Sequence, residues 1–296
     1  MSTVLNRAFR VLLAVLTATA LVAAPSVASA AVEPLTDEQW AAHVEALDAA
    51  VEQAKRDGRT TDVLYTVNGD GVHWFPARVI EQRLAADALY AKGDEAPDEG
   101  LAVLTGGLPG AGKTTVLTSS PFIDMSKYLV LSSDDAKEVM CERGMIPDLE
   151  GFAPMETADL IQKEASLITR MVADRAYRER KNVIWDTTMS SVEAVDQRVA
   201  PLRDAGYDEV AAMFLEVPIE VSVRRVDHRH RVGYERYRNG ARCEGRHVPT
   251  AFVRKHADAE WGSVNRKAFE ATKPRYDRWY FYDSTELPPV LVDQGP

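Results

Sequence analysis

The chain has 296 residues, of which 46% are hydrophobic and 27% charged, an ordinary composition for a soluble globular protein. This length suffices for one large domain, or for one domain with a smaller appendage. The formal net charge of -10 argues against general nucleic-acid binding, which depends on a basic surface. We therefore expect no nucleic-acid partner.

The first thirty residues have the three parts of an export signal. Arg7 and Arg10 precede an apolar run from Val11 to Ala24, and Ala28-Ser29-Ala30 follows as a small-residue cleavage site. The run is shorter than the about 20 residues that a membrane span needs. We expect residues 1–30 to be removed after Ala30, leaving a secreted or extracytoplasmic protein without a stable membrane span. The alternative is an amphipathic leader, or a start codon assigned upstream of a cytoplasmic protein.

The region that follows is expected to be a small α+β appendage. Thr36 and Gln39 have the spacing of a capping box, which predicts a helix running toward Lys55. Two apolar stretches within residues 63–75 flank a glycine-rich turn, which predicts a β-hairpin. A second helix is predicted after it, and the acidic stretch Gly93–Gly100 predicts a boundary. The predicted parts are residues 1–30 (signal), 31–99 (appendage) and 100–296 (main domain).

Beyond this boundary, short apolar runs alternate with longer helical patterns, which predicts crossover units and a mainly parallel sheet covered by helices on both faces. The expected fold is therefore α/β. In such sheets ligands bind beyond the carboxyl ends of the strands. The predicted strands are Leu101–Thr105, Tyr128–Leu131, Asn182–Asp186, Val210–Leu215 and Arg278–Tyr282.

The first of these strands leads into the segment GLPGAGKT at residues 107–114, which fits the phosphate-loop pattern G-x-x-x-x-G-K-[ST]. Its glycines allow several backbone N–H groups to point at one phosphate group. Lys113 would neutralise charge on the β and γ phosphates, and the Thr114 hydroxyl would bind Mg²⁺. The sequence thus predicts binding of ATP or GTP with Mg²⁺ through Gly107, Gly110, Ala111, Gly112, Lys113, Thr114 and Thr115.

The second strand is followed by Ser132-Ser133-Asp134-Asp135. A carboxylate just past a strand end can lie over the nucleotide and accept a proton from an attacking hydroxyl. Asp134 is the candidate base, and Asp135 is the neighbour from which it must be distinguished. The alternative is structural, since Ser133 and Asp134 both suit the N-terminus of a helix.

The third strand ends in Asp186-Thr187-Thr188. An acidic residue at this place can bind Mg²⁺ or the acceptor, and the threonines offer hydroxyl contacts. A side-chain-stabilised turn is the alternative. We favour function, because parallel sheets bind ligands at this edge. Glu164 lies in a long predicted helix and could reach the same site, but surface glutamates are common in such helices, so a structural position is favoured.

Eight arginines lie between Arg224 and Arg246. A mobile lid of this kind would stabilise charge on a transferring phosphoryl group and exclude water. A helix is predicted over Ile219–His230, and Gly233, Gly240 and Gly245 indicate that the arginine segment is not one uninterrupted helix. The alternative is a solvated basic surface. The two cysteines, Cys141 and Cys243, are far apart in sequence, so we expect unlinked thiols, with pairing in an oxidising compartment as the alternative.

Taken in order, these motifs make the chain resemble the zeta-toxin family of P-loop kinases. The resemblance covers most of residues 101–292 and includes the arginine segment, which ends in GRHVP, and the late strand WYFYDS. The sequence WFPAR at Trp74–Arg78 also resembles the lead-in of actinobacterial members. The matching motifs are GGLPGAGKTTVL at Gly106–Leu117, SSDDAK at Ser132–Lys137, QKEAS at Gln162–Ser166 and NVIWDTT at Asn182–Thr188.

The resemblance implies phosphorylation of a sugar hydroxyl, with UDP-N-acetylglucosamine as the best-known acceptor, and an antitoxin or immunity protein as partner. By position, Asp134 becomes the catalytic base, Glu164 and Thr188 become acceptor contacts, and Arg229 and Arg246 become the charge-stabilising pair. Well-known members have Glu-Gly-Thr and a nearby arginine where this chain has Asp186 to Ser190. The acceptor therefore stays open.

Two function classes remain after these observations. The first is a kinase that transfers the γ-phosphoryl group to a hydroxyl of a sugar nucleotide or of another small molecule. The second is an exported nucleotide-binding interaction protein without catalysis, which the export signal favours, because ATP is scarce outside cells.

Overall fold

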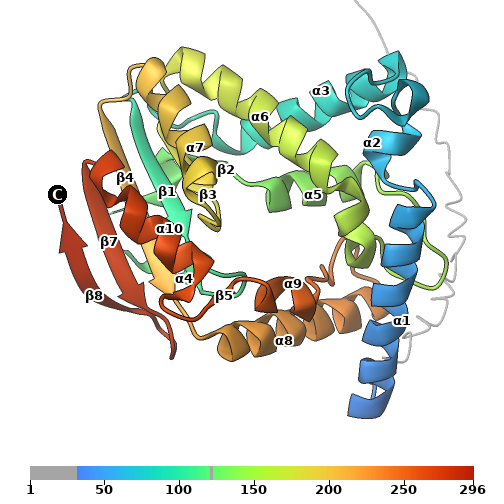
Figure 1. Cartoon of the computed structure of the whole chain (residues 1–296). Coiled ribbons are helices and arrows are strands. Elements are labelled where there is room, and N and C mark those ends of the chain that lie inside the picture. The colour runs from blue at the N-terminus through green and yellow to red at the C-terminus, as the bar shows by residue number, and fades with distance from the viewer. Residues whose placement is uncertain (1–31, 121–122) are drawn as a thin grey trace, which may run out of the picture. The chain divides into compact units, whose positions relative to one another are not determined.

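The computed structural model describes residues 32–120 and 123–296, and residues 33–296 form one compact unit (Figure 1). The predicted export signal lies outside the described residues. None of the described helices combines the length and the apolar character that crossing a bilayer requires.

A six-stranded sheet forms the centre of this unit, with strand order β2-β3-β1-β4-β7-β8. The first five strands in this order are parallel, and only β8 runs antiparallel to its neighbour within this sheet. This confirms the predicted mainly parallel sheet. The bounds are β1 Leu101–Gly106, β2 Leu129–Leu131, β3 Val183–Asp186, β4 Glu209–Glu216, β7 Arg278–Asp283 and β8 Val290–Gly295.

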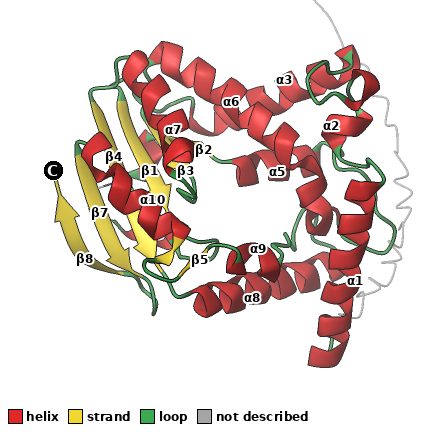
Figure 2. Cartoon of the chain, in the orientation of Figure 1, coloured by secondary structure: helices red, strands yellow, loops and turns green. Residues whose placement is uncertain are grey.

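Alternate residues of the strands point to opposite faces, and both faces are covered by helices (Figure 2). On one face Leu104, Trp185 and Phe214 pack into the larger core. On the other, Val103 and Ile184 pack against the short helix that follows the phosphate loop. The covering helices after β1 are α4 Lys113–Ser119, α5 Ser133–Glu142, α6 Gln162–Glu179, α7 Val192–Asp204, α8 Ile219–Arg238, α9 Thr250–Arg254 and α10 Val264–Thr272.

The region before β1 is helical. Helix α1 (Asp37–Arg56) begins with the predicted capping box of Thr36 and Gln39. The predicted hairpin is wrong: its first two residues end helix α2 (Thr61–Leu64), Val67–Gly69 form a 3-10 turn, and an isolated bridge joins Thr66 to Trp74. Helix α3 (Pro76–Tyr90) contributes its buried face to the same core as the sheet.

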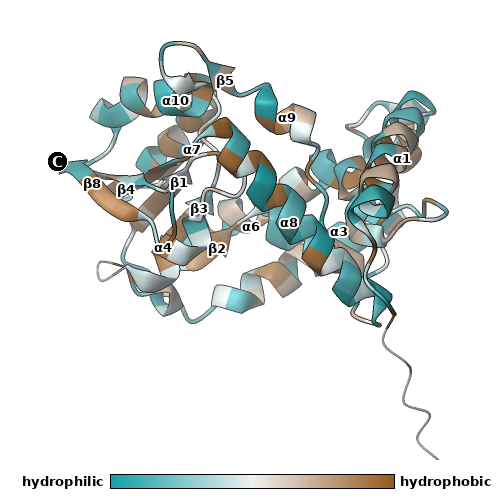
Figure 3. Cartoon of the chain, turned by 90° about the horizontal axis from the view of Figure 1, so that it is seen from below, coloured by the Kyte–Doolittle hydropathy of each residue, from teal (hydrophilic) through white to brown (hydrophobic). Residues whose placement is uncertain are grey.

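Helix α8 continues through Gly233 to Arg238, beyond the predicted end at His230, but it ends before Gly240, so the arginine segment is not one uninterrupted helix, as predicted. Figure 3 shows hydrophobic and hydrophilic residues following one another along this helix. The glycine allows a close approach: a Cβ atom on Gly233 would lie 2.5 Å from the backbone nitrogen of Gly245. Gly233 therefore serves packing rather than helix termination.

Candidate active site

The carboxyl ends of β1, β2 and β3 meet at one edge of the sheet, because the three strands are parallel and adjacent. Thr105 near the end of β1 lies opposite Asp186, the last residue of β3. Three of the predicted motifs, which follow these three strands in the sequence, are thereby gathered in one place.

The phosphate loop leaves β1 at Gly107, whose φ of 120° is in the range that favours glycine. A Cβ atom there would lie 2.3 Å from the carbonyl oxygen of Leu215, so no larger residue fits. Ser222 Oγ donates to the carbonyl of Pro109 at 2.5 Å, and Ser284 Oγ donates to that of Ala111 at 2.6 Å. The carbonyl groups of Pro109 and Ala111 are thus bonded to neighbouring elements. The N–H groups in the first turn of α4 have no partners within the helix and can bind a phosphate group.

Lys113 is the first residue of α4, and its Nζ lies 3.7 Å from Asp186 Oδ1. The same carboxylate oxygen accepts a hydrogen bond of 3.0 Å from Thr105 Oγ1. Thr187 Oγ1 accepts from the backbone N–H of Met189, so the turn after β3 is stabilised by Thr187 rather than by Asp186. Asp186 therefore faces the phosphate loop.

A hydroxyl and a carboxylate are the oxygen ligands that Mg²⁺ prefers. Thr114 is exposed in the first turn of α4, next to the lysine that Asp186 approaches. These two residues fit a magnesium ion bound between the loop and β3.

Asp134 lies in the first turn of α5, where Ser132 is the capping residue. The Ser132 hydroxyl accepts from the backbone N–H groups of Asp134 and Asp135. The capping alternative for Asp134 is therefore wrong. Its carboxylate instead forms an ion pair with Arg246 and lies 3.5 Å from Lys137 Nζ.

Lys137 is a residue that sequence reasoning missed. Its side chain is buried, and burial lowers its pKa to about 8. Burial also raises the pKa of Asp135, and the carboxylate of Asp186 acts in the same direction. The spacing of Lys137 from Asp134, three residues along one helix, is the signal that could have identified it.

Arg246 comes from the loop after α8, and that loop is held on both sides of the arginine. Cys243 forms a disulfide with Cys141 of α5, so the expectation of unlinked thiols is wrong. Gly245 packs against the backbone of α8, and His247 Nε2 lies 2.8 Å from Asp48 Oδ1 of α1. The two cysteines are 102 residues apart in sequence, and no local pattern indicates that the fold brings them together.

The second predicted arginine, Arg229, is exposed on α8. Its surroundings lower its pKa through desolvation, while the carboxylates of Asp186 and Glu138 act to raise it. Burial lowers the pKa of Arg246 to about 10. Asp134 and its partner Arg246 thus lie past the end of β2, at the sheet edge that also carries Asp186 and the phosphate loop.

Comparison with known proteins agrees with this geometry. A sequence profile of the family described as Zeta toxin matches residues 86–276, more than half of the chain. The chain belongs to the zeta-toxin family. A search of curated proteins gives no significant sequence match.

Among solved structures, the AvrRxo1-ORF1:-ORF2 complex with ATP has a TM-score of 0.60 at 14% identity, covering 79% of this chain and 76% of that chain. The same complex with sulphate ions gives 0.57 at 14% identity, with the same coverage of 79% and 76%. The PezAT toxin-antitoxin system of Streptococcus pneumoniae gives 0.49 at 15% identity, covering 75% and 81%, too slight to support an argument. These likenesses show the fold alone.

Two acceptor contacts that the zeta-toxin resemblance implied have different environments. Glu164 is fully buried, and its two oxygens accept from Arg78 Nε and Nη2, both at 2.8 Å, and from Gln82 Nε2. It joins α6 to α3 and does not face solvent. Thr188 lies beside the phosphate loop, where its carbonyl accepts from Gly107 N at 3.1 Å. Only Thr188 lies with the other motifs.

The place where well-known zeta toxins have an arginine is occupied here by Met189 and Ser190. Met189 is 2% exposed, and its sulfur would lie 2.4 Å from a Cβ atom on Gly106. The methionine therefore fills the core beneath the phosphate loop. It offers no charge to an acceptor.

Glu216, the last residue of β4, is a further side chain that the sequence reading missed. Burial raises its pKa to about 7, although the nearby Arg266 acts to lower it. Its Oε2 lies 3.7 Å from Arg266 Nη1, too far for a hydrogen bond. Its position at the carboxyl end of a parallel strand is the signal that could have identified it.

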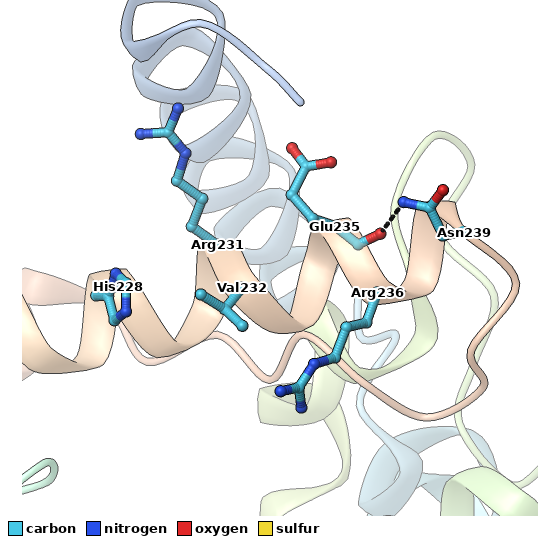
Figure 4. A pocket seen from close by; sticks show the side chains of 6 residues that line it. All are labelled: His228, Arg231, Val232, Glu235, Arg236 and Asn239. Atoms are coloured by element: carbon cyan, nitrogen blue, oxygen red, sulfur yellow. Dashed lines mark hydrogen bonds between the residues drawn. The ribbon is translucent and has the colours of Figure 1, made fainter. Parts of the chain in front are cut away.

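A hollow of about 570 Å³ lies along α8 (Figure 4). Its described lining consists of His228, Arg231, Val232, Glu235, Arg236 and Asn239. It contains no residue of the phosphate loop and neither Arg229 nor Arg246, so we do not place the reaction there.

Proposed function

We propose that this zeta-toxin family member is a kinase that transfers the γ-phosphoryl group of ATP or GTP to a hydroxyl of a small molecule. One observation carries the proposal: Asp134, paired with Arg246, follows β2 at the same edge of the sheet where Lys113 and Asp186 follow β1 and end β3. A kinase needs this combination, a phosphate-binding loop, cations for the transferred group and a base for the attacking hydroxyl.

In this proposal the acceptor oxygen attacks the γ phosphorus, and the bond to the oxygen that bridges the β and γ phosphates breaks. Asp134 accepts the proton of the acceptor hydroxyl, and the bridging oxygen leaves with the nucleoside diphosphate. Lys113 stabilises charge on the phosphates, and Arg229 and Arg246 stabilise the charge of the transferring group. A Mg²⁺ ion bound by Thr114 and Asp186 would supply further positive charge to the phosphate oxygens.

The acceptor in this proposal is a sugar nucleotide such as UDP-N-acetylglucosamine. Its support is the family membership, and the inward-facing Met189 counts against the well-known mode of acceptor binding. Mass spectrometry after incubation with ATP, Mg²⁺ and UDP-N-acetylglucosamine should detect a phosphorylated product. Other sugars, antibiotics and nucleic-acid ends should be tested in the same way. A phosphorylated product from one of them would identify a different acceptor, and no product from any of them would indicate that catalysis is absent.

We further propose that the protein acts after export, following removal of residues 1–30. The disulfide between Cys141 and Cys243 supports this, because disulfides persist in oxidising compartments. N-terminal sequencing of the protein from its native host tests it directly: a mature chain that begins after Ala30 is expected, and an intact Met1 in the cytoplasmic fraction contradicts export.

The disulfide also favours the second candidate function, an exported nucleotide-binding protein without catalysis. The Asp134→Asn variant separates the two, since the kinase should lose phosphoryl transfer while it keeps nucleotide binding. Both candidates allow an antitoxin or immunity protein as partner. The structurally similar AvrRxo1-ORF1:-ORF2 is itself a complex, which supports a search for such a partner.

A further inference from the structure

A second group of charged side chains lies away from the phosphate loop, between α1, α8 and the segment η4 (Pro154–Ile161). We call His43, Glu156 and His230 the histidine cluster. The Nε2 atoms of both histidines lie 2.7 Å from the same oxygen, Oε1 of Glu156. The Glu156 and His230 side chains are 0% and 1% exposed, and that of His43 is 13% exposed. Three elements thus direct three metal-type ligands at one buried point.

Each member of the cluster is held by an outer contact. The second oxygen of Glu156 accepts from the backbone N–H of Ala153 at 2.9 Å. The ring of Trp40 stacks on His43 and also contacts His230. Outer contacts of this kind fix the orientation of metal ligands in proteins.

Behind His230, a row of contacts continues to the surface. His230 Nδ1 lies 3.2 Å from His247 Nδ1, and His247 Nε2 lies 2.8 Å from Asp48 Oδ1. The carboxylates of Glu156 and Asp48 only accept hydrogen bonds. The three contacts in this row therefore need three N–H groups, whereas two neutral imidazoles carry one each.

A second proton on one ring would supply the third N–H group, and a cation at His230 Nε2 removes the mismatch with both rings neutral. His230 then gives a lone pair to the ion and donates from Nδ1 to His247, which donates from Nε2 to Asp48. Both rings are neutral, and each remaining contact has one donor and one acceptor. This row of ligand, second ring and carboxylate is the kind of outer support that metal-bound histidines have.

We propose that His43, Glu156 and His230 bind one Zn²⁺ ion. Two imidazole nitrogens and one carboxylate oxygen suit zinc, whereas Mg²⁺ and Ca²⁺ prefer oxygen ligands alone. One ligand atom from each residue lies within 4.8 Å of the other two. Zinc bonds of about 2.0–2.1 Å in tetrahedral geometry separate ligand atoms by about 3.3 Å, so only small ring movements are required.

The ion would join α1 to α8 directly, since His43 lies on α1 and His230 on α8. His230 follows Arg229 in the chain, and the supporting His247 follows Arg246. Zinc would therefore hold the two predicted phosphoryl-stabilising arginines in place from behind. The binding itself does not depend on the kinase proposal.

The test uses the full chain with its disulfide intact, purified through a tag that binds no metal and stripped with a chelator. The intact disulfide matters because reduced cysteines would bind zinc themselves. After dialysis against Zn²⁺, we expect one zinc per chain by elemental analysis and a higher melting temperature than in chelator. Co²⁺ in place of Zn²⁺ should give the visible absorption bands of a four-coordinate site, with water as the ligand beside the three side chains.

Variants locate the ion. His43→Gln and His230→Gln should each weaken Zn²⁺ binding by at least about a hundredfold, and His247→Gln by about 10- to 100-fold. His228→Gln is the matched control, because His228 is exposed on the same helix and outside the cluster. Circular dichroism in metal-free buffer checks that each variant folds. If the variant of buried His230 does not fold, the affinity of the His43→Gln variant tests the site, because His43 is partly exposed.

Two results would overturn the proposal. One is a parent protein that retains no zinc after dialysis, which would make the cluster a hydrogen-bonded core contact. The other is zinc binding that survives in folded His43→Gln at parental affinity, which would place the ion elsewhere.

Discussion

The phosphate side and the arginine side of the candidate site are built in different ways. On the phosphate side, Gly107 to Thr115 form one continuous segment that runs from the end of β1 into the first turn of α4. On the arginine side, Asp134, Arg229 and Arg246 come from separate parts of the chain. They are brought together by a disulfide and by packing of the loop against α8.

This difference between the two sides explains why one function is specified by a short motif and the other is not. Phosphate binding depends on backbone N–H groups of adjacent residues, so a short motif specifies it. Charge stabilisation at the acceptor depends on long side chains whose positions are set by distant residues. Changes on the arginine side should therefore alter catalysis and stability together, whereas changes on the phosphate side should act on nucleotide binding.

The largest effect is expected for Arg246→Ala. Removal of an arginine that stabilises a transferring phosphoryl group costs about 10³–10⁵ in rate in related chemistry. We expect a fall in kcat in this range, with nucleotide affinity changed far less. Arg242→Ala, an exposed arginine in the same loop, is the control. Equal losses in the two variants would show that Arg246 has no special role.

Asp134→Asn should follow, with a loss of about 10²–10⁴ in kcat, the usual contribution of a general base. Nucleotide binding, measured by calorimetry, should persist. Asp135→Asn is the discriminating neighbour and should lose less activity. A greater loss of kcat in Asp135→Asn than in Asp134→Asn would show that Asp135, and not Asp134, is the base.

The next largest effect is expected from removal of the disulfide between Cys141 and Cys243, which should lower the stability of the chain. Closing a loop of about 100 residues is expected to contribute about 2–4 kcal/mol to the free energy of unfolding. The midpoint of urea denaturation should therefore be lower for Cys243→Ser than for the parent. Reductant should lower the midpoint of the parent to that of the variant. Reductant should leave a double variant of Cys141→Ser and Cys243→Ser unchanged. A parent that is insensitive to reductant would contradict the contribution of the disulfide to stability.

The smallest effect concerns pH. Burial raises the pKa of Glu216 from 4.5 to about 7, so its folded form favours the protonated carboxyl. This contribution to stability is present below 4.5 and is lost as the pH rises through about 7. Glu216→Gln should therefore be more stable than the parent above pH 7, by at most about 3 kcal/mol.

The gain of Glu216→Gln should vanish in acid, where both side chains are neutral. Glu209→Gln, at the other end of the same strand, is the control. A constant difference between the Glu216→Gln variant and the parent across the pH range would contradict the burial argument.

The sequence predicts the parallel part of this fold well, because buried parallel strands are continuous apolar runs that end in the motifs described above. The strand β8 was not expected. Its Val290 and Leu291 are exposed on an edge, where pairing depends on the backbone of β7. The N-terminal hairpin was predicted wrongly, because its turn residues also suit the ends of short helices.

Within the site, the phosphate loop and the strand-end carboxylates could be predicted, since each follows a strand directly. The disulfide and the burial of Lys137 could not, because they depend on residues that only the fold brings together. The pairing of Glu164 with Arg78 is of the same kind, and it joins the motif WFPAR to the motif QKEAS.

The central claim is that backbone amides of the loop, together with Lys113 and Thr114, bind a magnesium-nucleotide complex. Isothermal calorimetry of the folded chain with ATP or GTP and Mg²⁺ tests it most directly, with Lys127→Ala, an exposed lysine, as the control for Lys113→Ala. We expect one nucleotide per chain, an affinity at least about tenfold weaker in Lys113→Ala, and no change in the control. Absence of binding heat for both nucleotides, or equal affinities in parent and Lys113→Ala, would contradict the account.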